Sequence, residues 1–500
     1  MTVSALRVQL CNGAAERPRG DYVLYWMIGA RRTRYNPALE HAVALCRRFE
    51  RPLLVVEPLR AGYPWASDRL HAFVLRGMRD NAAALARHRV TYLPYVEREP
   101  GGGRGLLRAL AARACSVVTD EQPGFFLPRM LAAAAAQLDV RLSSVDGCGV
   151  LPLRASERAY PSAALFRRHL QKALAPHLHA FPVADPLCHL PLGPAAEPPA
   201  AALRRYPMAS AGLLDGAAAA LAALPIDHAV APVETPGGSV AAAAALEEFL
   251  QRRLARYADG RNQLDQDVAS GLSPYLHFGH LAAHDAVAAV LRRSAWDVGR
   301  ALDAKPTGRR EGWWGLPRES EAFLDELITW RELGHGFAFH RADYDRYESL
   351  PDWARRSLDE HAGDPRAPCY RLAELEAAAT HDPLWNAAQR ELLRHGRIHN
   401  YLRMLWGKKI LEWTASPREA LRVMIELNNK YALDGRDPNS YSGIFWTLGR
   451  FDRPWAPTRP IFGCIRYMSS ANTARKMSVK GYLARHGEAP VSGSARAAAS

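Results

Sequence analysis

The chain has 500 residues, 48% hydrophobic and 23% charged, which is typical of a soluble globular protein with more than one domain. These proportions exclude a disordered or collagen-like chain, and no apolar run reaches the about 18 residues of a membrane span. The 65 lysines and arginines exceed the 51 acidic residues and give a net charge of +14, which indicates a polyanionic partner such as nucleic acid.

The cysteines indicate a reduced environment. There are seven of them, an odd number at scattered positions without a CxxC pair, which favours neither a disulfide framework nor a metal site. The first 22 residues lack the apolar stretch of a secretory signal. We therefore expect a cytoplasmic protein, associated with the nucleoid if the source is bacterial.

Short apolar runs alternate with helical patterns in the first 150 residues. The predicted strands are 22–27, 52–57, 90–96, 115–120 and 140–145. The predicted helices between them are 36–48, 67–89, 103–113 and 127–138. This alternation predicts a Rossmann-like parallel sheet covered by helices, with ligands at the carboxyl ends of the strands. The GGGRG sequence at 101–105 is too weak a match to indicate a phosphate site.

Composition changes further along the chain. Residues 183–240 are rich in alanine and proline and predict an interdomain connector with room for one Ala-rich helix. From about residue 241 the pattern is helical, and ten of the twelve tryptophans lie at or after position 296. We expect an α/β domain at 20–182, an all-α domain at 241–483 and a disordered tail at 484–500.

The segment from His381 to Trp413 predicts two helices that carry tryptophans. Asp382 followed by proline is an N-cap signal, and Gly396 is a helix stop. Trp406 and Trp413 are seven residues apart, on one face of the second predicted helix. Large tryptophans ordinarily fill a core; the alternative is a path along which an electron hops between a buried cofactor and solvent.

Two polar segments follow. Residues 428–446 (NNKYALDGRDPNSYSGIFW) hold turn formers, amides and carboxylates, which suit either a structured loop or the ribose and ring edge of a cofactor. Residues 453–467 (RPWAPTRPIFGCIRY) interleave three arginines with tryptophan, phenylalanine and tyrosine. This mixture suits a solvated basic loop or a nucleic-acid surface, where cations meet phosphate and flat rings meet bases.

The chain resembles the class II cyclobutane pyrimidine dimer photolyases of the photolyase/cryptochrome superfamily over residues 20–483. The motifs that carry the resemblance are DYVLYWM at 21–27, GLSPYLHFG at 271–279, FLDELITWREL at 323–333, LWNAAQ at 384–389, RMLWGKKILEW at 403–413, LDGRDPNSYSG at 433–443 and RPIFGCIRYM at 459–468. The resemblance implies a carbon–carbon lyase that uses FAD, active as FADH⁻, and blue light to split dimers flipped out of double-stranded DNA.

The resemblance also implies roles for particular residues. It places flavin contacts at Tyr257, Ala269, Ser270, Gly271, Leu272, Ser273, Arg331, Asn428, Asp434, Gly435 and Arg436, with Asn428 facing flavin N5. It places lesion and DNA contacts at Arg261, Glu326, Trp330, Met404, Trp446, Arg453 and Trp455, with Glu326 bonding the pyrimidines. Glu326 and Trp330 are i and i+4, so one helix would present both to the same pocket.

For photoreduction, the resemblance makes Trp406 the flavin-proximal tryptophan and Trp385 the distal one, and it leaves the role of Trp413 open. The stretch between Trp446 and Trp455 is one residue shorter than in the family, and Asp452 stands where a His-Asp pair is usual. The family implies a possible antenna chromophore, a deazaflavin or a folate, in the α/β domain, although it assigns no residues for one here. We expect no metal and no membrane partner.

Three alternatives are open. A photosensory cryptochrome shares the fold and the flavin, and a DNA-binding flavoprotein without repair activity keeps the basic surface. A (6-4) photolyase uses active-site histidines, but we expect His280 and His284, i and i+4 on one predicted helix, to be ordinary surface or cap residues. Because a lesion-scanning protein needs an open basic face, a monomer is expected.

Overall fold

The computed structural model describes residues 3–191, 193–299 and 304–487. By compactness the chain divides into two units. The first combines Met1–Ala258, Val268–Ser349 and Leu433–Ser442, and the second combines Asp259–Asp267, Leu350–Ala432 and Gly443–Ser500. The domain limits expected from composition stay a prediction, and each compact unit is described by itself.

A six-stranded sheet forms the α/β part of the first unit, with strand order β1-β6-β5-β2-β3-β4. The strands are β1 Val8–Leu10, β2 Tyr22–Trp26, β3 Leu53–Leu59, β4 Thr91–Val96, β5 Ala114–Glu121 and β6 Leu142–Asp146. Neighbouring strands are parallel except for β1, which pairs antiparallel with β6. Each of the five predicted strands overlaps an observed one, and the predicted parallel sheet is confirmed.

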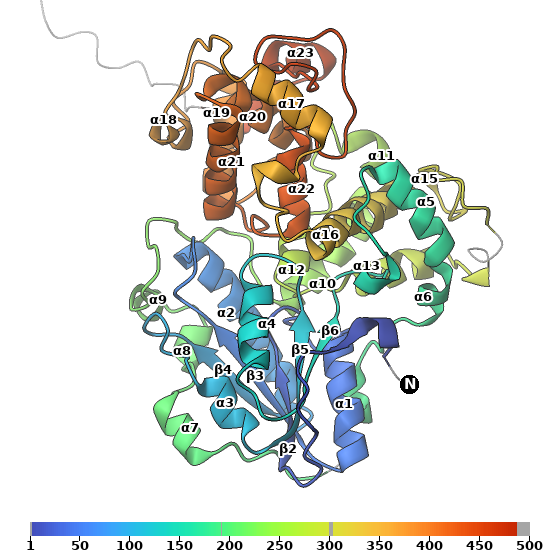
Figure 1. Cartoon of the computed structure of the whole chain (residues 1–500), viewed down its shortest axis with the longest axis vertical. Helices are drawn as coiled ribbons and strands as arrows, with labels where there is room; N and C mark the ends of the chain where they lie inside the picture. Colours follow the sequence, from blue (N-terminus) through green and yellow to red (C-terminus); the bar gives the residue numbers. More distant parts are fainter. Residues whose placement is uncertain (1–2, 192, 300–303, 488–500) are drawn as a thin grey trace, which may run out of the picture. The chain divides into compact units, whose positions relative to one another are not determined.

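Helices cover both faces of this sheet (Figure 1). They are α1 Pro37–Phe49, α2 Asp68–Ala86, α3 Leu106–Ala111 and α4 Leu127–Ala135. Because side chains alternate along a strand, Val23 and Tyr25 of β2 face the α1 side, whereas Leu24 and Trp26 face the α3 side. All five residues of β2 are buried, so the strand reads as one continuous apolar run.

The connector region contains several short helices rather than the single predicted one. They are α7 Ala200–Arg205, α8 Ala211–Leu214 and α9 Ala218–Ala222. Tyr206, directly after α7, is buried in the core on the α3 side of the sheet, and its hydroxyl donates to the Arg104 carbonyl at 2.6 Å. The connector is therefore packed against the α/β part, because Tyr206 and Leu187 are buried in the cores on the two sides of the sheet.

The remaining elements are helical. In the first unit they include α5 Ala163–Ala173, α6 Ala175–His179, α10 Ser239–Glu248, the π-helical turn η4 Phe249–Arg253, α11 Tyr257–Gly260, α12 Ser273–His277, α13 Ala283–Arg293, α15 Arg318–Leu324, the π-helical turn η6 Asp325–Trp330 and α16 Arg331–His340. In the second they are α17 Asp352–Glu360, α18 Leu372–Glu376, α19 Pro383–His395, α20 Asn400–Trp413, α21 Pro417–Tyr431, α23 Ser470–Lys476 and α24 Lys480–His486. Helix α22, Pro438–Trp446, contributes residues to both units.

The predicted helix signals around the tryptophans are confirmed. Asp382 caps α19 by accepting from the backbone N–H groups of Leu384 and Trp385, and Gly396 ends the helix with a φ of 66°. Helix α24 reaches His486, inside the predicted tail, and residues 488–500 lie outside the described part. Within the described ranges, no helix has the length and apolarity needed to cross a membrane.

Candidate active site

A polar cavity of about 140 Å³ lies in the first unit. It brings together several residues that the resemblance assigned to the flavin, from four separate stretches of the chain. The lining comprises Tyr257, Ser270, Leu272, Ser273, Leu276, Phe323, Glu326, Leu327, Arg331, Asp434, Asp437, Asn439 and Ser440. Hydroxyls, carboxylates, an amide and a guanidinium on an apolar base are the groups that a nucleotide-type ligand needs.

Glu326 and Trp330 lie on the π-helical turn η6, between the α-helices α15 and α16. The prediction that one helical stretch carries both residues holds, but this stretch hydrogen-bonds i to i+5 rather than i to i+4. Such π turns are frequent at functional sites because they re-aim side chains within a helix. Both residues are half-buried, while Asp325 beside them is buried and paired with Arg167 at 2.6 Å.

Asp437 is the centre of a buried polar network beside this cavity. Its carboxylate accepts from His277 Nδ1 at 3.4 Å and lies 3.9 Å from His335 Nε2. Burial alone would raise the pKa of Asp437, but His335, the bond from His277 and nearby Arg331 hold it well below its usual range. Arg436 donates to His277 Nε2 at 3.3 Å, so the His277 proton must sit on Nδ1. The network fixes the orientation of the 434–437 stretch.

Helix α16 is anchored to the loop after β6 by its first two residues. Arg331 donates to the Cys148 carbonyl at 2.6 Å, and Glu332 accepts from the backbone N–H groups of Val150 and Leu151 at 2.7 and 3.0 Å. Burial raises the pKa of Glu332 to about 7, although these N–H groups and Arg331 oppose the shift. These bonds hold the Arg331 side chain at the cavity wall.

The residues around the cavity fit part of a flavin dinucleotide, since about 140 Å³ is smaller than the about 300–1,000 Å³ of a site that holds a whole small molecule. Gly271 has a φ of +70°, and the space where a Cβ would stand is open, so a ligand can approach the backbone there. Tyr257 packs edge-on against Phe249 and Phe323 and forms an aromatic wall. Arg436 does not line the cavity: its guanidinium lies over the Tyr63 and Phe278 rings, and its buried Nε has no hydrogen-bond partner among the described residues.

Three tryptophans form a chain of rings in the second unit. Trp406 and Trp385 are parallel, with ring centroids 6.5 Å apart and an interplanar angle of 2°. Trp385 also meets Trp413, at 5.7 Å and 68°. The indole N–H of Trp385 donates to the Trp406 carbonyl at 3.1 Å, and that of Trp406 donates to Gln389 at 2.9 Å. Trp385 therefore lies between the other two, and Trp413 continues the chain.

The chain of rings extends to residues that sequence reasoning missed. Tyr370 packs edge-on against Trp413 at 5.6 Å, and its hydroxyl lies 2.8 Å from Nδ1 of the exposed His381. Tyr370 is half-buried, so this end of the chain is near solvent. No local motif marks Tyr370; only its contact with Trp413, 43 positions away by numbering, reveals it.

Several other residues that the resemblance predicts to contact flavin or DNA belong to the second unit, which is built from three segments of the chain. Asn428 is 1% exposed on α21 and donates to Asn429 at 3.2 Å. Met404 of α20 lies beside Gly443 of α22, where an added Cβ would stand 3.7 Å from the methionine methyl group. Trp446 is half-buried at the end of α22, and Arg453 lies over the Trp455 ring at 4.6 Å. Arg261 is half-buried in the short 259–267 segment.

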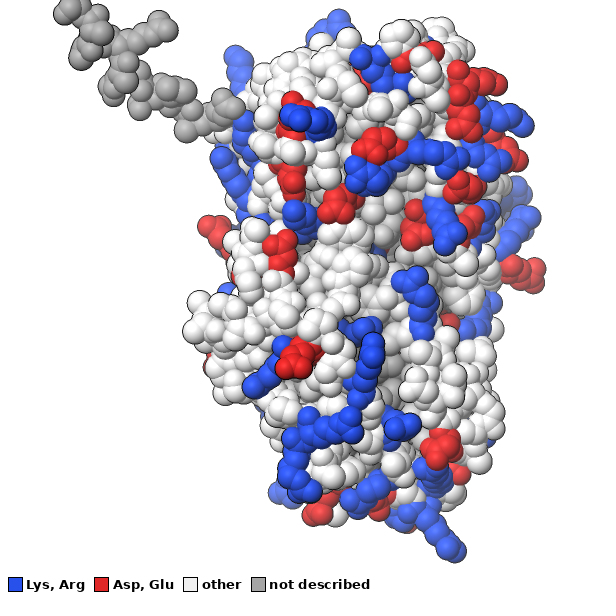
Figure 2. All heavy atoms as spheres, turned by 60° about the vertical axis from the view of Figure 1, so that its left-hand side comes forward, with Lys and Arg blue, Asp and Glu red and all other residues white. Residues whose placement is uncertain are grey.

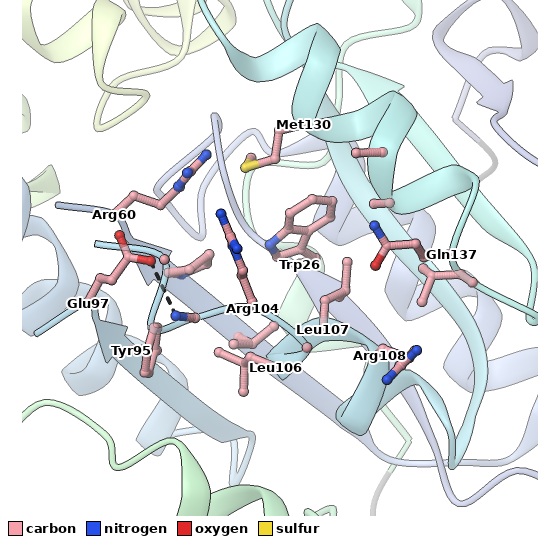
Figure 3. A pocket seen from close by; sticks show the side chains of 18 residues that line it. Trp26, Arg60, Tyr95, Glu97, Arg104, Leu106, Leu107, Arg108, Met130 and Gln137 are labelled. Atoms are coloured by element: carbon pink, nitrogen blue, oxygen red, sulfur yellow. Dashed lines mark hydrogen bonds between the residues drawn. The ribbon is translucent and has the colours of Figure 1, made fainter. Parts of the chain in front are cut away.

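A second cavity, of about 380 Å³, lies in the α/β part at the carboxyl ends of β2, β3 and β4. Figure 3 shows Arg60 and Arg104 projecting into it beside the Trp26 ring, with Met130 and Gln137 of the α4 region opposite. The GGGRG segment, too weak a signal on its own, lines this cavity through Gly101, Gly103, Arg104 and Gly105. The cavity lies at the strand ends, where the strand-end rule places ligands, but the sequence did not show which loops enclose it.

Glu97 holds the two loops at the mouth of this second cavity. The side chain is 2% exposed, and it accepts from the backbone N–H of Ala61 at 2.9 Å and of Gly103 at 3.2 Å. Among the described residues, Glu97 is the one carboxylate that lines the cavity, against the three guanidinium groups of Arg60, Arg104 and Arg108, so the charge of the lining is positive on balance. The cavity therefore suits a planar ligand that carries negative charge.

The expectation that His280 and His284 are surface residues on one helix is wrong. They are 2% and 0% exposed, and only His284 belongs to α13. His280 stacks on Phe73 and accepts from the Gly238 N–H, and His284 packs against Phe181. Burial lowers the pKa of both, that of His280 to about 3, so both are neutral core residues at neutral pH.

Figure 2 shows one face of the molecule by charge. Lysine and arginine gather over the α/β part with few acidic residues among them, whereas both signs mix over the second unit. On this face, positive charge is therefore concentrated over the α/β part.

A strand-end cavity, a separate polar cavity and a buried tryptophan chain are features that the resemblance to the photolyase class leads one to expect. The chain is 34% identical to a deoxyribodipyrimidine photo-lyase of Methanothermobacter thermautotrophicus, over 97% of this chain and 98% of the relative. It is 36% identical to the rice (Oryza sativa subsp. japonica) photo-lyase, over 95% of this chain and 89% of the relative. The chain therefore belongs to the deoxyribodipyrimidine photo-lyase family and is a lyase.

A solved structure supports the fold. The chain superimposes on a bacterial class III photolyase from Agrobacterium tumefaciens with a TM-score of 0.64 and 16% identity, covering 93% of this chain and 86% of that one. No family model matches the sequence. The predicted fold class, a Rossmann-like α/β part followed by a large helical part, is confirmed.

Proposed function

We propose that this chain is a class II deoxyribodipyrimidine photo-lyase that repairs cyclobutane pyrimidine dimers in double-stranded DNA under blue light. The observation that carries the proposal is the 34% identity to the Methanothermobacter photo-lyase over nearly the whole of both chains. The class II assignment rests on the motif resemblance. We further propose that it acts as a monomer in the cytoplasm, associated with the nucleoid in a bacterium.

FAD is the cofactor that the first unit would hold. Tyr257, Ser270 and Ser273 would bind it by aromatic contact and by hydroxyl donors, and Arg331 would bind a phosphate as a charged fork. Asp434 offers a carboxylate for ribose hydroxyls, and Asn428 an amide that can face flavin N5. When reduced and excited by light, FAD supplies the electron that opens the cyclobutane ring and takes it back afterwards.

The lesion would be held by one polar and two aromatic contacts. Glu326 hydrogen-bonds the pyrimidines, while Trp330 and Trp446 stack on them. Extrusion is least costly for a damaged pair, because the dimer already weakens stacking and pairing. The preference for damaged DNA would therefore come from these side chains, and not from net charge.

The remaining DNA contacts would be electrostatic. Arg261 and Arg453 neutralise phosphates, and Trp455 fills space left by the flipped dimer. Because each neutralised phosphate releases counterions, affinity for DNA of any sequence falls as salt is raised. The ratio of affinities for damaged and undamaged DNA should change much less.

The tryptophan chain would supply the electron that reduces oxidised flavin. Trp406 is the proximal donor, Trp385 the middle one and Trp413 the next, because the rings contact one another in that order. Illumination in the presence of an external reductant should therefore convert oxidised enzyme to the active form.

The 380 Å³ cavity of the α/β part would hold an antenna chromophore. Its volume lies in the about 300–1,000 Å³ range of small-molecule sites. The Trp26 and Tyr95 rings offer a flat apolar wall, and Arg60 and Arg104 offer positive charge. A deazaflavin or a folate meets these requirements, since each joins a planar ring system to acidic or anionic groups.

Repair is tested by illuminating flavin-loaded, pre-reduced enzyme with an oligonucleotide that contains one cyclobutane thymine dimer. Dimers should disappear in blue light and persist in the dark. Persistence of the dimer in the light, with reduced flavin bound, would refute the proposed function. Repair of a (6-4) photoproduct instead would move the chain to another branch of the family.

The antenna site is tested by filling the cavity. Ala134→Trp places a ring among the lining residues of α4, so the second chromophore band should vanish while the flavin band stays. Ala132→Trp, on an exposed position of the same helix, is the control and should keep both bands. Equal chromophore content in the two variants would show that the antenna binds elsewhere.

A further inference from the structure

Lys408 of α20 is an unusual residue in the second unit, because its side chain is fully buried, with 0% exposure. Its Nζ donates to the Thr447 carbonyl at 2.6 Å. In the described part of the chain no carboxylate lies within ion-pair distance of it. A buried ammonium without a carboxylate partner is costly, so a lysine at this position calls for a specific role.

Trp446 is the aromatic partner of Lys408. Nζ lies 5.2 Å from the centroid of the Trp446 ring, which is within the range of a cation–π contact. Arg466 lies over the same ring at 5.6 Å and over Trp455 at 4.8 Å, and Arg453 lies over Trp455 at 4.6 Å. Cations and indoles thus alternate from Lys408 to Arg453, and Lys408 is the buried member of this series.

The backbone of α20 comes close to two side chains at Gly407, and this contact fixes where Lys408 lies. A Cβ on Gly407 would stand 2.7 Å from Thr447 Cγ2 and 3.0 Å from Met424 Sδ, so only glycine allows α20 to come this near. The next residue, Lys408, is therefore delivered beside Trp446 and Thr447. The Thr447 carbonyl follows the last turn of α22, where carbonyls lack helical partners and attract cations.

We propose that Lys408 is a positioning residue for repair, which holds the Trp446 ring in the orientation that receives the flipped dimer. The ammonium fixes the ring by a cation–π contact while its bond to the Thr447 carbonyl fixes the end of the helix that carries the ring. The inference rests on the proposed function, in that Trp446 contacts the dimer.

A dependence on pH follows. Burial lowers the pKa of Lys408 to about 7, Asp452 opposes the shift and Arg466 adds to it. Asp452 and Arg466 are the charged groups that act on Lys408, and Lys409 beside it is engaged with Glu412. The ammonium form is present below this pKa and is lost as the pH rises through it. Because only the charged form makes the cation–π contact, the hold on Trp446 weakens above neutral pH.

The test measures the affinity of the holoenzyme in the dark for a dimer-containing duplex and for its undamaged counterpart, from pH 6 to pH 8.5. The ratio of the two affinities for the wild type should fall by about three- to tenfold across this range, the size of one buried cation–π contact. Lys408→Arg, which stays charged throughout, should flatten the profile. Lys408→Met should give the low ratio at every pH.

Two controls separate positioning from general damage to the fold. Lys409→Met removes a neighbouring lysine that is 8% exposed, and its ratio and pH profile should match the wild type. Combining Lys408→Met with Trp446→Leu should cost little more than Trp446→Leu alone, because Lys408 acts through that ring. Additive losses would overturn the inference.

The outcomes also distinguish the inference from the proposed function. A wild type without preference for the dimer duplex contradicts both. A wild type that prefers it with a ratio independent of pH contradicts the role of Lys408 alone, even where Lys408→Met does not fold. A lower melting temperature of Lys408→Met with an unchanged affinity ratio would likewise overturn the inference and leave Lys408 a structural residue.

Discussion

Replacing Trp385 by phenylalanine should separate photoreduction from repair. Trp385 is fully buried and is the only ring, among the described residues, recorded in contact with both Trp406 and Trp413. Phenylalanine fills most of the space but is far harder to oxidise, so the path from Trp406 outward is interrupted at its middle. Oxidised enzyme should then fail to accumulate reduced flavin under light.

The structural cost of Trp385→Phe is modest. The variant loses the indole bond to the Trp406 carbonyl and part of one buried ring, together about 1–3 kcal/mol. Such a loss lies below the about 5–15 kcal/mol by which proteins are ordinarily stable, so the variant should fold and bind flavin. A binding defect therefore cannot be the reason for lost photoreduction if flavin content is unchanged.

The assay follows flavin absorbance during illumination with a reductant, and separately follows dimer repair by enzyme reduced chemically beforehand. Trp385→Phe should block the first and leave the second nearly intact. Trp353→Phe, outside the chain of rings, is the control and should leave both intact. Equal loss of both activities in Trp385→Phe, or unchanged photoreduction, would refute the order of the chain derived from the ring contacts.

Three further predictions concern stability. Asp437→Asn should lower the melting temperature at pH 7; because the native pKa is depressed, this contribution is fully present above about pH 4 and is lost only as the pH falls towards the depressed native pKa, so the difference between the two melting temperatures should shrink steadily below pH 4. The native pKa of Glu332 is raised to about 7, so the unfolded chain ionises at lower pH than the folded one and the wild type should lose stability as the pH rises from about 4.3 towards 7. Glu332→Gln cannot ionise there, so its melting temperature should fall less over this range. A melting temperature that falls with pH as steeply as that of the wild type would contradict this. Gly407→Ala should cost about 1–3 kcal/mol in denaturant unfolding, because the methyl group would stand 2.7 Å from Thr447 Cγ2, and a neutral effect would show that α20 can shift away.

The parallel sheet could be predicted because its strands are buried on both faces. Tyr22–Trp26 and Leu53–Leu59 read as apolar runs that no amphipathic helix would show. Strand β1 was missed for the opposite reason: it has three residues, two of them exposed, and it is defined by pairing with β6 and not by its own pattern. Edge strands of this kind carry little local signal.

Helix type and long-range contacts could not be read from the sequence. The stretch Asp325–Trp330 has the residues of an ordinary helix, and nothing in its local pattern predicts the π turn that it forms. The burial of His280 depends on Phe73, which is remote in the chain. The motif resemblance named several residues that line one cavity, and their contact with flavin stays a prediction. Asp437 as the centre of a histidine network, and Tyr370 beyond Trp413, became visible only through contacts.

The indole bonds described above restrict where protons can go. The N–H of Trp385 faces a backbone carbonyl and that of Trp406 faces an amide oxygen, and neither partner is a base that can accept a proton at neutral pH. In the proposed electron path, positive charge would therefore pass through these buried rings without any proton leaving them, and it would stay free to recombine. Within the described ranges, Tyr370 is the one ring of this series with a recorded bond to a base, the imidazole of His381, so in the proposed path the outermost ring is where charge separation would be made lasting by releasing a proton towards water.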